Sequence, residues 1–488
     1  MSKRVAVIGL DGMPWHILIK LVKNGAMPNL KKIMSHSTKG ILKSTIPPIT
    51  PTAWTSMTTG VNPGKHGVFG FMKLTKGTDL SILNSYDVRY TRLHEMVALM
   101  GLKSLCVNLP LTYPIYKIRN IHVISDWMAP ILSFYPEKLR KYAAIYPEYM
   151  LYHFWSGQEA LQNLFEDSIK RVEAINIMIE ELNWNVAWIV YTEPDNIFHG
   201  WYEDVFTNNM ILGIFKKIDE TIEKAVNLSD LVMIVSDHGF SKFDYLLSIN
   251  TLLYKLGFAS KTWKRKIKEV DHRPIKFKEK RVKIRIPSEI YKFLSLKQIK
   301  FVLKKVFSFL SGGKDIRAEI PSIDLEKSKA FYLSHTNGIW VKTHTLIKQI
   351  IESLRKTEGI KGVWRREELF HGPYVSLAPH ILISPDYDNG YQLHSSSIYP
   401  DVIMKSTVYD HHPDGIFIAY GQEVSPGWVG NINCEDIVPT ILNYLDLPLP
   451  VDTDGKIIKG ISSTPKKVRY YNYLNHWLLS RRLYKLKI

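Results

Sequence analysis

The sequence predicts an α/β protein: a mostly parallel β-sheet with helices on both of its faces. Short, β-branched apolar runs recur along the chain and stop abruptly at polar residues, as strands of a covered sheet do. Helical patterns lie between these runs, and such alternation is typical of α/β folds. With 488 residues, 45% of them hydrophobic, the chain can form a sizeable core. Its length allows one large domain with insertions, or two to three domains.

Four apolar runs are the predicted strands: residues 5–10 (VAVIGL), 186–191 (VAWIVY), 231–235 (LVMIV) and 415–421 (GIFIAYG). All four are apolar on both faces, which suits buried strands of a parallel sheet. Helical patterns at residues 27–34 and 165–182 lie between them.

Aspartates stand where three of the four runs stop. Asp11 follows the first run, Asp195 comes shortly after the second, and Asp237 closely follows the third. In open parallel sheets, ligands bind beyond the carboxyl ends of the strands. We therefore expect one composite site at that edge.

The segment STIPPITPTAWTSMTTG, residues 44–60, contains the candidate nucleophile. A helix that starts at Pro51 has proline where its missing N–H costs nothing. Thr50 is then the N-cap, and its hydroxyl lies near free backbone N–H groups and the positive end of the helix dipole. There it can ionise more easily, above all beside a metal, and attack phosphorus. The alternative is a capping threonine without chemistry.

Two pairs of residues have the chemistry of metal ligands. Asp195 and His199 are four residues apart, so a helix would place them on one face. Asp237 and His238 are adjacent, but the chain can turn at Gly239 and point both side chains into one crevice. Taken separately, each pair could instead be a chance spacing or a surface loop.

Further candidates make a metal centre the better explanation. Asp11 could simply cap a helix, and the segment YDHHPDG, residues 409–415, could be a polar turn. Together, however, three carboxylates and three imidazoles would be costly to crowd without a cation. Two divalent metals roughly 3.5–4 Å apart are the usual device for in-line phosphoryl displacement.

Two stretches interrupt the α/β alternation. Residues 111–170 are rich in tyrosine and are predicted to form a helical cap insertion, and residues 250–320 a basic insertion. The predicted core is then made of residues 1–110, 171–249 and 321–462, followed by a basic tail, residues 463–488.

The net charge of +18 is concentrated in part of the chain. Residues 261–285 contain twelve Lys or Arg residues against three Asp or Glu residues. This segment could contact anionic lipid or nucleic acid, or it could be a solvated lysine-rich surface. The sequence predicts no obligatory protein partner.

Two cysteines, Cys106 and Cys434, cannot build a disulfide framework, which favours a reducing compartment. No apolar run reaches the length of a membrane span. We therefore expect a cytoplasmic protein, either free or peripheral to the membrane surface.

An ordered set of motifs carries a family resemblance: VIGLDGM, TPTAWTSMTTGVNPGKHGVFGF, EPDNIFH, IVSDHGF, HHPDGIFIAYG and CEDIVPTILNYLDLPLPVDTDGK. In this order they resemble the alkaline phosphatase superfamily, and most closely its type I phosphodiesterase/nucleotide pyrophosphatase branch in microbial form. The resemblance runs from about residue 4 to about residue 460, with gaps at 110–170 and 250–320, and it implies an alkaline-phosphatase-like core.

Carried over residue by residue, the resemblance implies a nucleophile and two metal sites. Thr50 is the nucleophile. One metal is bound by Asp11, Thr50, Asp237 and His238, and the other by Asp195, His199 and His411, with His412 as a rival for the last position. The family's metals are usually zinc, and ligands of this type also admit Mn, Fe or Co.

The implied reaction is ping-pong hydrolysis of a phosphate ester through a threonyl-phosphate, most simply of a phosphodiester. A phosphomonoesterase, a phosphonate hydrolase or a phosphotransferase of the same superfamily are alternatives. A sulfatase is disfavoured, since threonine cannot become formylglycine. A non-catalytic basic protein that binds nucleic acid or membrane is the alternative from another class, but the retained ligands argue against it.

One departure bears on the substrate. Nucleotide-type members carry Asp-Asn after the His-Gly of the nucleophile region, and that asparagine contacts phosphate; here the pair is Gly70-Phe71. The departure weakens a specific assignment as a nucleotide pyrophosphatase. The sequence identifies no substrate-binding residue.

Overall fold

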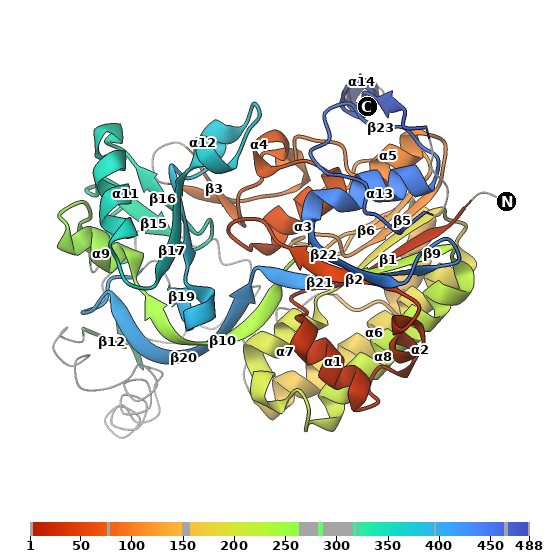
Figure 1. Cartoon of the computed structure of the whole chain (residues 1–488), viewed down its shortest axis with the longest axis horizontal. Helices are drawn as coiled ribbons and strands as arrows, with labels where there is room; N and C mark the ends of the chain where they lie inside the picture. The colour runs from red at the N-terminus through yellow and green to blue at the C-terminus, as the bar shows by residue number, and fades with distance from the viewer. Residues whose placement is uncertain are drawn as a thin grey trace.

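The computed structural model describes residues 3–75, 79–148, 157–262, 282–285, 316–319, 322–394, 397–462 and 467–486. Figure 1 shows two lobes: a large core lobe with the central sheet, and a smaller second lobe. Two long strands, β10 (Gly239–Leu247) and β20 (Ile403–His412), pair antiparallel and run from one lobe to the other.

Nine strands form the central sheet within the described residues. Their order is β22 (Gly427–Asn433), β2 (Thr38–Lys43), β21 (Asp414–Gly421), β9 (Leu231–Val235), β1 (Val5–Leu10), β8 (Val186–Tyr191), β5 (Ser104–Val107), β6 (Ile121–Ile124) and β7 (Phe134–Tyr135). Most neighbouring pairs are parallel, as predicted. The fourth predicted strand departs from that pattern, because β21 is antiparallel to both β2 and β9.

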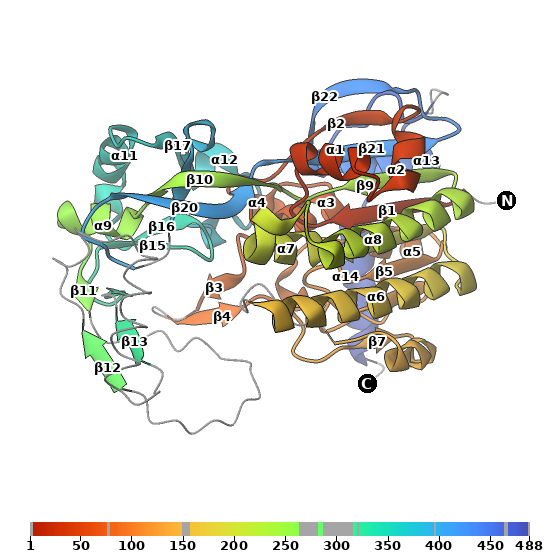
Figure 2. The same cartoon turned by 90° about the horizontal axis from the view of Figure 1, so that it is seen from below.

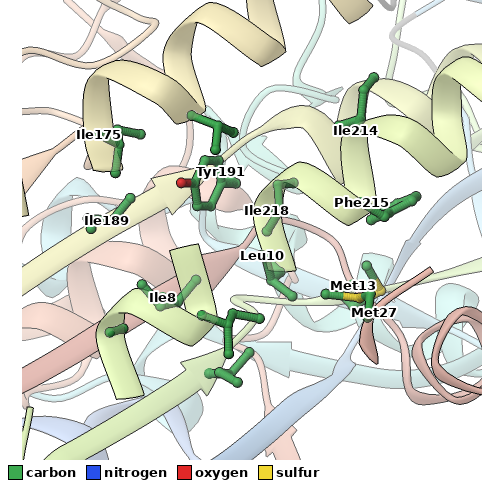
Figure 3. Packing of buried hydrophobic residues seen from close by; sticks show 14 of the residues in the cluster. Ile8, Leu10, Met13, Met27, Ile175, Ile189, Tyr191, Ile214, Phe215 and Ile218 are labelled. Carbon is green, nitrogen blue, oxygen red and sulfur yellow. The ribbon is translucent and has the colours of Figure 1, made fainter. Parts of the chain in front are cut away.

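Alternate residues of β1 pack on opposite faces of the sheet, because side chains alternate along a strand. Ala6, Ile8 and Leu10 belong to the hydrophobic cluster under α1 (Trp15–Lys23), α2 (Pro28–Met34), α6 (Gln158–Glu181) and α8 (Asn209–Leu228). Val5 and Val7 belong to the cluster under α3 (Thr50–Thr59), α5 (Leu93–Leu99) and α13 (Ile437–Tyr444). Figures 2 and 3 show the first of these layers. Because each cluster lies under its own set of helices, helices cover both faces of the sheet, as predicted.

The helices of the first layer follow from their apolar spacing. Helix α8 buries Ile211, Ile214, Phe215 and Ile218 at intervals of three and four residues, so one stripe faces the sheet. The Asn208 side chain accepts a hydrogen bond from the backbone N–H of Met210, which caps the helix. Helix α2 matches its predicted range closely, and α6 begins before its predicted start.

The second lobe has a sheet and a hydrophobic cluster of its own. Its strands are β15 (Ala330–Leu333), β16 (Gly338–Val341), β18 (Ile381–Pro385) and β17 (Ile360–Arg365). Helices α9 (Ile249–Lys255) and α11 (Ile347–Arg355) contribute Leu253 and Ile350 to this cluster. Strand β19 (Tyr391–Leu393) extends the β10–β20 ribbon.

The domain boundaries differ from the prediction in two places. Residues 322–394, predicted as core, contribute to the second lobe, because β15, β16, β18 and β17 form a sheet of their own and none of the strands in this range joins the central sheet. Within the described part of 111–170, which lacks residues 149–156, β6 and β7 join the central sheet, so this part is not the predicted helical cap. Tyr142 and Tyr146 of this segment are buried in the core cluster, so these two aromatic side chains pack inward.

The basic segment 261–285 lies outside the described residues, except for 261–262 and 282–285. In the tail, α14 (Tyr473–Leu486) follows the short strand β24 (Tyr470–Tyr471), which pairs with β23 (Leu449–Pro450). No helix within the described ranges is long and apolar enough to cross a membrane.

Short elements complete the described chain: α4 (Pro63–His66), α7 (Glu193–Trp201), α12 (Arg366–Leu369), β3 (Met72–Leu74), β4 (Leu80–Ile82), β11 (Lys261–Thr262), β12 (Val282–Arg285), β13 (Ile316–Glu319) and β14 (Ser322–Ile323).

Candidate active site

The order of the strands brings the polar strand ends together. Strand β1 lies between β8 and β9, with Leu10 opposite Tyr191 and Gly9 opposite Val235. Asp11 therefore lies next to the segments that follow β8 and β9. The first of these is α7, and the second carries Asp237 and His238. The structure thus forms a single site at the expected edge of the sheet.

The first group of side chains surrounds His238. Its Nε2 atom lies 3.5 Å from Asp11 Oδ1 and 3.4 Å from Asp237 Oδ2. Thr50, the first residue of α3, places its Oγ1 atom 3.1 Å from the same nitrogen. All four residues are buried, so their polar atoms face one another rather than bulk water.

The second group surrounds Asp195. Its Oδ1 atom lies 3.5 Å from His199 Nε2 and 3.4 Å from His411 Nε2. The two histidine Nε2 atoms are 3.2 Å apart. His199 comes from one turn further along α7, and His411 from the end of β20. Two segments that lie far apart in the sequence therefore meet in the second group.

The two groups adjoin. The rings of His238 and His411 stack with centroids 3.7 Å apart, and one ligand atom each of Asp195, His238 and His411 fall within 4.8 Å of one another. Gly12, with φ +70°, passes between the groups. A Cβ atom there would lie 3.2 Å from Asp195 Oδ1 and 3.3 Å from His238 Cε1.

Backbone carbonyls orient both stacked histidines. His238 Nδ1 lies 2.9 Å from the carbonyl oxygen of Gly239, and His411 Nδ1 lies 3.1 Å from that of Pro48. Since a carbonyl can only accept, each Nδ1 carries the proton in these contacts. In the neutral form of each ring, Nε2 is then left with a lone pair directed into the site, as in metal-binding histidines.

The carboxyl groups differ in their preferred charge. Burial, together with the charges of Asp237 and Asp195, raises the pKa of Asp11 well above its ordinary value. Burial likewise raises the pKa of Asp237, and the charge of Asp195 adds to the effect. Burial also opposes the ionisation of Asp195, but His199 and His411 outweigh it and hold the pKa of Asp195 below the ordinary range.

The two stacked histidines differ in the same way. Burial and the charge of His411 lower the pKa of His238 well below its usual value. Burial also disfavours the charged form of His411, but its contact with Asp195 raises the pKa of His411 to about 9. The pKa of each of these five carboxyl and imidazole groups therefore depends on the charge of its neighbours.

The residues fit divalent cations. Asp11 Oδ1, Asp195 Oδ1 and Asp237 Oδ2 are buried and have no hydrogen-bond donor within the described part of the chain. Such oxygens are costly to bury unless a donor or a cation satisfies them. Carboxylate oxygens and imidazole Nε2 lone pairs are ordinary ligands of zinc and related metals.

The structure corrects the predicted role of Thr50 as an N-cap. Helix α3 begins at Thr50, and Ile49 is the capping position. The Thr50 hydroxyl contacts His238 and no N–H of its own helix. The reason is tertiary: His238 offers a buried polar partner that local sequence cannot reveal.

The structure separates His411 from its neighbour. In β20 the two side chains point in opposite directions, as successive residues of a strand do. His412 Nδ1 accepts the backbone N–H of Asp414 at 3.1 Å, and its ring packs against Tyr387. The arrangement places His411, and not His412, in the site.

Asp410 was not among the predicted site residues. One ligand atom each of Asp410, His199 and His411 lie within 4.8 Å of one another. Asp410 Oδ1 also accepts the backbone N–H of His411 at 2.8 Å. The only sequence signal was its place in YDHHPDG, a segment with several candidate ligands.

Gly70 and Phe71, at the position of the family's Asp-Asn pair, contact the second lobe. The Phe71 N–H donates to the carbonyl of His335 at 3.1 Å, and its ring lies 6.0 Å from that of Trp127. A Cβ atom on Gly70 would lie 2.1 Å from the same carbonyl oxygen. An aromatic side chain therefore stands at the position where the resemblance implies an amide in nucleotide-type members.

The chain matches a protein-family model. The model described as "Type I phosphodiesterase / nucleotide pyrophosphatase" matches residues 5–351. A search of curated proteins finds no match.

Solved structures share the fold. Phosphonoacetate hydrolase from Sinorhizobium meliloti 1021, in complex with phosphonoformate, is 14% identical with a TM-score of 0.54, and the match covers 86% of this chain and 90% of that one. Human ectonucleotide pyrophosphatase/phosphodiesterase 5 is 14% identical with a TM-score of 0.55, over 93% and 97% of the two chains. The inactive threonine-to-alanine variant of the murine protein, in complex with AMP, is 12% identical with a TM-score of 0.50, over 93% and 98%.

Proposed function

The chain belongs to the type I phosphodiesterase/nucleotide pyrophosphatase family of the alkaline phosphatase superfamily. From this premise we propose that it hydrolyses phosphodiesters, with Thr50 as the nucleophile and two divalent cations as cofactors. One observation carries the proposal. The Thr50 hydroxyl lies 3.1 Å from His238, within a buried group of carboxylates and imidazoles at the carboxyl edge of the sheet.

Two sets of residues would hold the cations. Asp11, Asp237 and His238, together with Thr50, form one set, and Asp195, His199 and His411 form the other. When bound, the cations would neutralise the crowded carboxylates and favour ionisation of the nucleophile and of the leaving oxygen. Zinc suits these nitrogen and oxygen ligands, and Mn, Fe or Co would also be accepted.

The chain's own residues provide the nucleophile and its orientation. Thr50 Oγ1 attacks phosphorus, and the bond from phosphorus to the leaving oxygen breaks, which releases the first alcohol and leaves a phosphothreonine ester. Water then attacks the phosphorus, and the bond to Thr50 Oγ1 breaks, which releases the monoester and restores the hydroxyl. The free backbone N–H groups in the first turn of α3 would help to hold the phosphate of the substrate.

The type of residue at the nucleophile position supports the proposal. The murine neighbour that is inactive carries alanine in place of a threonine and binds AMP. Thr50 is the threonine of this chain that stands at the start of a helix beside candidate ligands. The family description itself, phosphodiesterase and nucleotide pyrophosphatase, supports a diester over a monoester substrate.

A phosphonate substrate is the second candidate. The Sinorhizobium neighbour is a phosphonoacetate hydrolase, and its match covers most of both chains. In this chain, Phe71 replaces the amide that nucleotide-type members use to contact phosphate, which makes a nucleotide-specific site less well supported.

The reducing cytoplasm is the compartment that we propose. The described cysteines, Cys106 and Cys434, are both free and buried. Neither therefore contributes to a disulfide, in keeping with a compartment where thiols stay reduced.

Turnover of bis-p-nitrophenyl phosphate by the purified full-length chain, with metal content measured in parallel, tests the proposal. We expect Thr50→Ala to lower turnover at least about a thousandfold, because the nucleophile is lost. We expect this variant to keep its metals, because carboxylates and imidazoles supply most of the ligands. Phosphonoacetate, assayed beside the diester, distinguishes the two candidate substrates.

Thr58→Ala is the matched control. Thr58 lies on the same helix and is equally buried, but its hydroxyl donates to the carbonyl of Trp54 at 2.7 Å. Its loss should cost roughly 1 kcal/mol of stability and leave turnover unchanged. Near-normal turnover by Thr50→Ala would contradict the assignment of the nucleophile, and metal-loaded protein inert to all phosphate and phosphonate esters would contradict the proposed function.

A further inference from the structure

Large apolar side chains are exposed together at the C-terminal end of the chain. Tyr470 is 63% exposed, Leu479 56% and Val451 54%, and Val468 and Leu478 are exposed as well. We call these five residues the C-terminal patch. Exposed apolar residues are unremarkable when scattered, but a group of them on one part of the surface indicates a binding surface.

Contacts between neighbouring segments assemble the patch. Strand β24 pairs with β23, which sets Tyr470 opposite Leu449, and the backbone N–H of Val451 donates to the carbonyl of Tyr471 at 3.3 Å. The Tyr471 hydroxyl is 3.0 Å from His476 Nδ1 on α14. Figure 1 shows α14 beside β23, at the edge of the core lobe.

Helix α14 buries one side and exposes the other. Tyr473 and Trp477 are buried one turn apart, so they fix the helix on the core. Leu478 and Leu479, which follow Trp477, are exposed. A helix that only covered the core would place polar residues at these two positions.

Basic residues accompany the apolar ones. The Trp477 ring packs against that of Tyr116, at 5.7 Å, and Lys117 and Arg119 follow Tyr116 in an exposed stretch. Neither of these two cations, nor exposed Lys467 beside Val468, has an ion-pair partner within the described ranges. Arg469 differs, because it pairs with Asp446 at 3.4 Å.

We propose that the C-terminal patch docks the protein peripherally on a membrane surface that carries anionic lipid. Aliphatic and tyrosine side chains flanked by unpaired Lys and Arg are typical of surfaces that lie in the headgroup region of a bilayer. The positive charges of the exposed Lys and Arg residues favour lipids with negatively charged headgroups, and the net charge of +18 of the whole chain also favours such a surface. Leucine and valine favour lipid over nucleic acid, since contacts to nucleic acid go mostly to phosphate and sugar, which offer these side chains no apolar partner.

Co-sedimentation of the full-length chain with phosphatidylcholine vesicles, with and without about 30 mol% phosphatidylglycerol, tests the proposal. We expect binding to the anionic vesicles only, weakened by salt. Lys117→Gln combined with Arg119→Gln should reduce the partition coefficient about 25-fold, since each cation near such a surface contributes about fivefold. Leu478→Ser combined with Leu479→Ser should reduce it at least about tenfold.

Leu377→Ser is the matched control for the apolar pair. Leu377 is 50% exposed but lies in the second lobe, away from the C-terminal patch, so its substitution should leave vesicle binding unchanged. All variants should keep wild-type turnover of the soluble diester, because no residue of the patch lies in the candidate active site.

Three results would overturn the proposal: no binding of the unmodified chain to anionic vesicles, equal binding to neutral vesicles, or unchanged binding after the Leu478/Leu479 double substitution. Single-stranded DNA is assayed in parallel. Loss of DNA binding in the Lys117/Arg119 variant, with vesicle binding unchanged, would assign the surface to nucleic acid instead. None of these results depends on which ester the enzyme hydrolyses.

Discussion

Gly12 shows how a single residue determines whether the two halves of the site can meet. It adopts φ +70°, a conformation that residues with a Cβ atom rarely take. Asp195 and His238 both approach the space where a side chain would begin. Gly12 also donates its N–H to Asp237 Oδ1 at 3.3 Å, so the same backbone that makes room also holds a candidate ligand.

Gly12→Ala should lower both metal content and turnover. The added Cβ atom would push Asp195 or His238 aside by a few tenths of an ångström, and ligand geometry tolerates little displacement. The left-handed backbone should cost a further 1–2 kcal/mol, roughly, in unfolding free energy. Bound metal per chain, diester turnover and thermal denaturation measure the three effects.

Gly25→Ala separates strain from crowding. Gly25 has a similar φ of +75°, but no atom lies within 4 Å of the position of its added Cβ. It should lose similar stability and keep full metal content and activity. If both variants lost metal equally, backbone strain rather than the space around Gly12 would be the cause.

At the scale of elements, helix α7 is held by a buried ion pair. Glu193, its first residue, pairs with Arg171 of α6, and both side chains are almost completely buried. Asp195 and His199 lie on the same helix, so this pair fixes the start of the element that carries two of the three residues of the candidate second metal site. A carboxylate near a helix N-terminus also interacts favourably with the helix dipole.

Arg171→Met should destabilise the protein by about 3–5 kcal/mol, because it leaves Glu193 buried without its cation. It should also lower metal occupancy, since α7 can then shift. Denaturant unfolding and metal analysis provide the measurements. Combining Arg171→Met with Glu193→Gln should recover part of the stability, because the unpaired charge is removed.

Arg140→Met is the comparison for an exposed pair. Arg140 contacts Glu137 at 2.5 Å, but both side chains are mostly solvent-exposed. Water screens such pairs, so little change in stability is expected. An equally small effect of Arg171→Met would show that the buried pair does not hold α7 in place.

At the scale of the whole molecule, the two lobes meet at the candidate active site. Strand β10 begins directly after His238, and β20 reaches His411 and His412 at its end. Phe240 of β10 pairs with His411 of β20. Candidate ligands therefore lie at the core ends of both strands that connect the lobes, and bound cations would fasten this connection to the sheet.

Removal of metal with a chelator should loosen that connection selectively. Hydrogen exchange should accelerate at residues 239–241 and 410–412, because ligand residues at those strand ends lose their shared partner. Strand β16, in the interior of the second lobe, serves as the internal reference and should keep its protection. Exchange that rose equally in both places, or in neither, would contradict this view of how the lobes are joined.

Local signals in the sequence predicted the core strands and the polar residues at their ends. A short run in which every residue is apolar predicts a strand that is buried on both faces. Asp11, Asp195 and Asp237 follow such runs. Parallel neighbours then bring these ends to one edge. The apolar strands β15 and β18 were not among the predicted strands, and their sequences do not say which sheet they join.

The sequence by itself therefore determined the α/β class, the positions of the core strands and the kinds of side chain at their carboxyl ends. It could do so because strand burial and turn formation depend on residues that are close together in the sequence. Only the tertiary structure decided that β21 runs antiparallel, that a second lobe interrupts the core, that Thr50 faces His238, and that His411 rather than His412 enters the site. These outcomes depend on pairing between segments far apart in the chain. A shift of one residue in such pairing reverses the direction of every side chain.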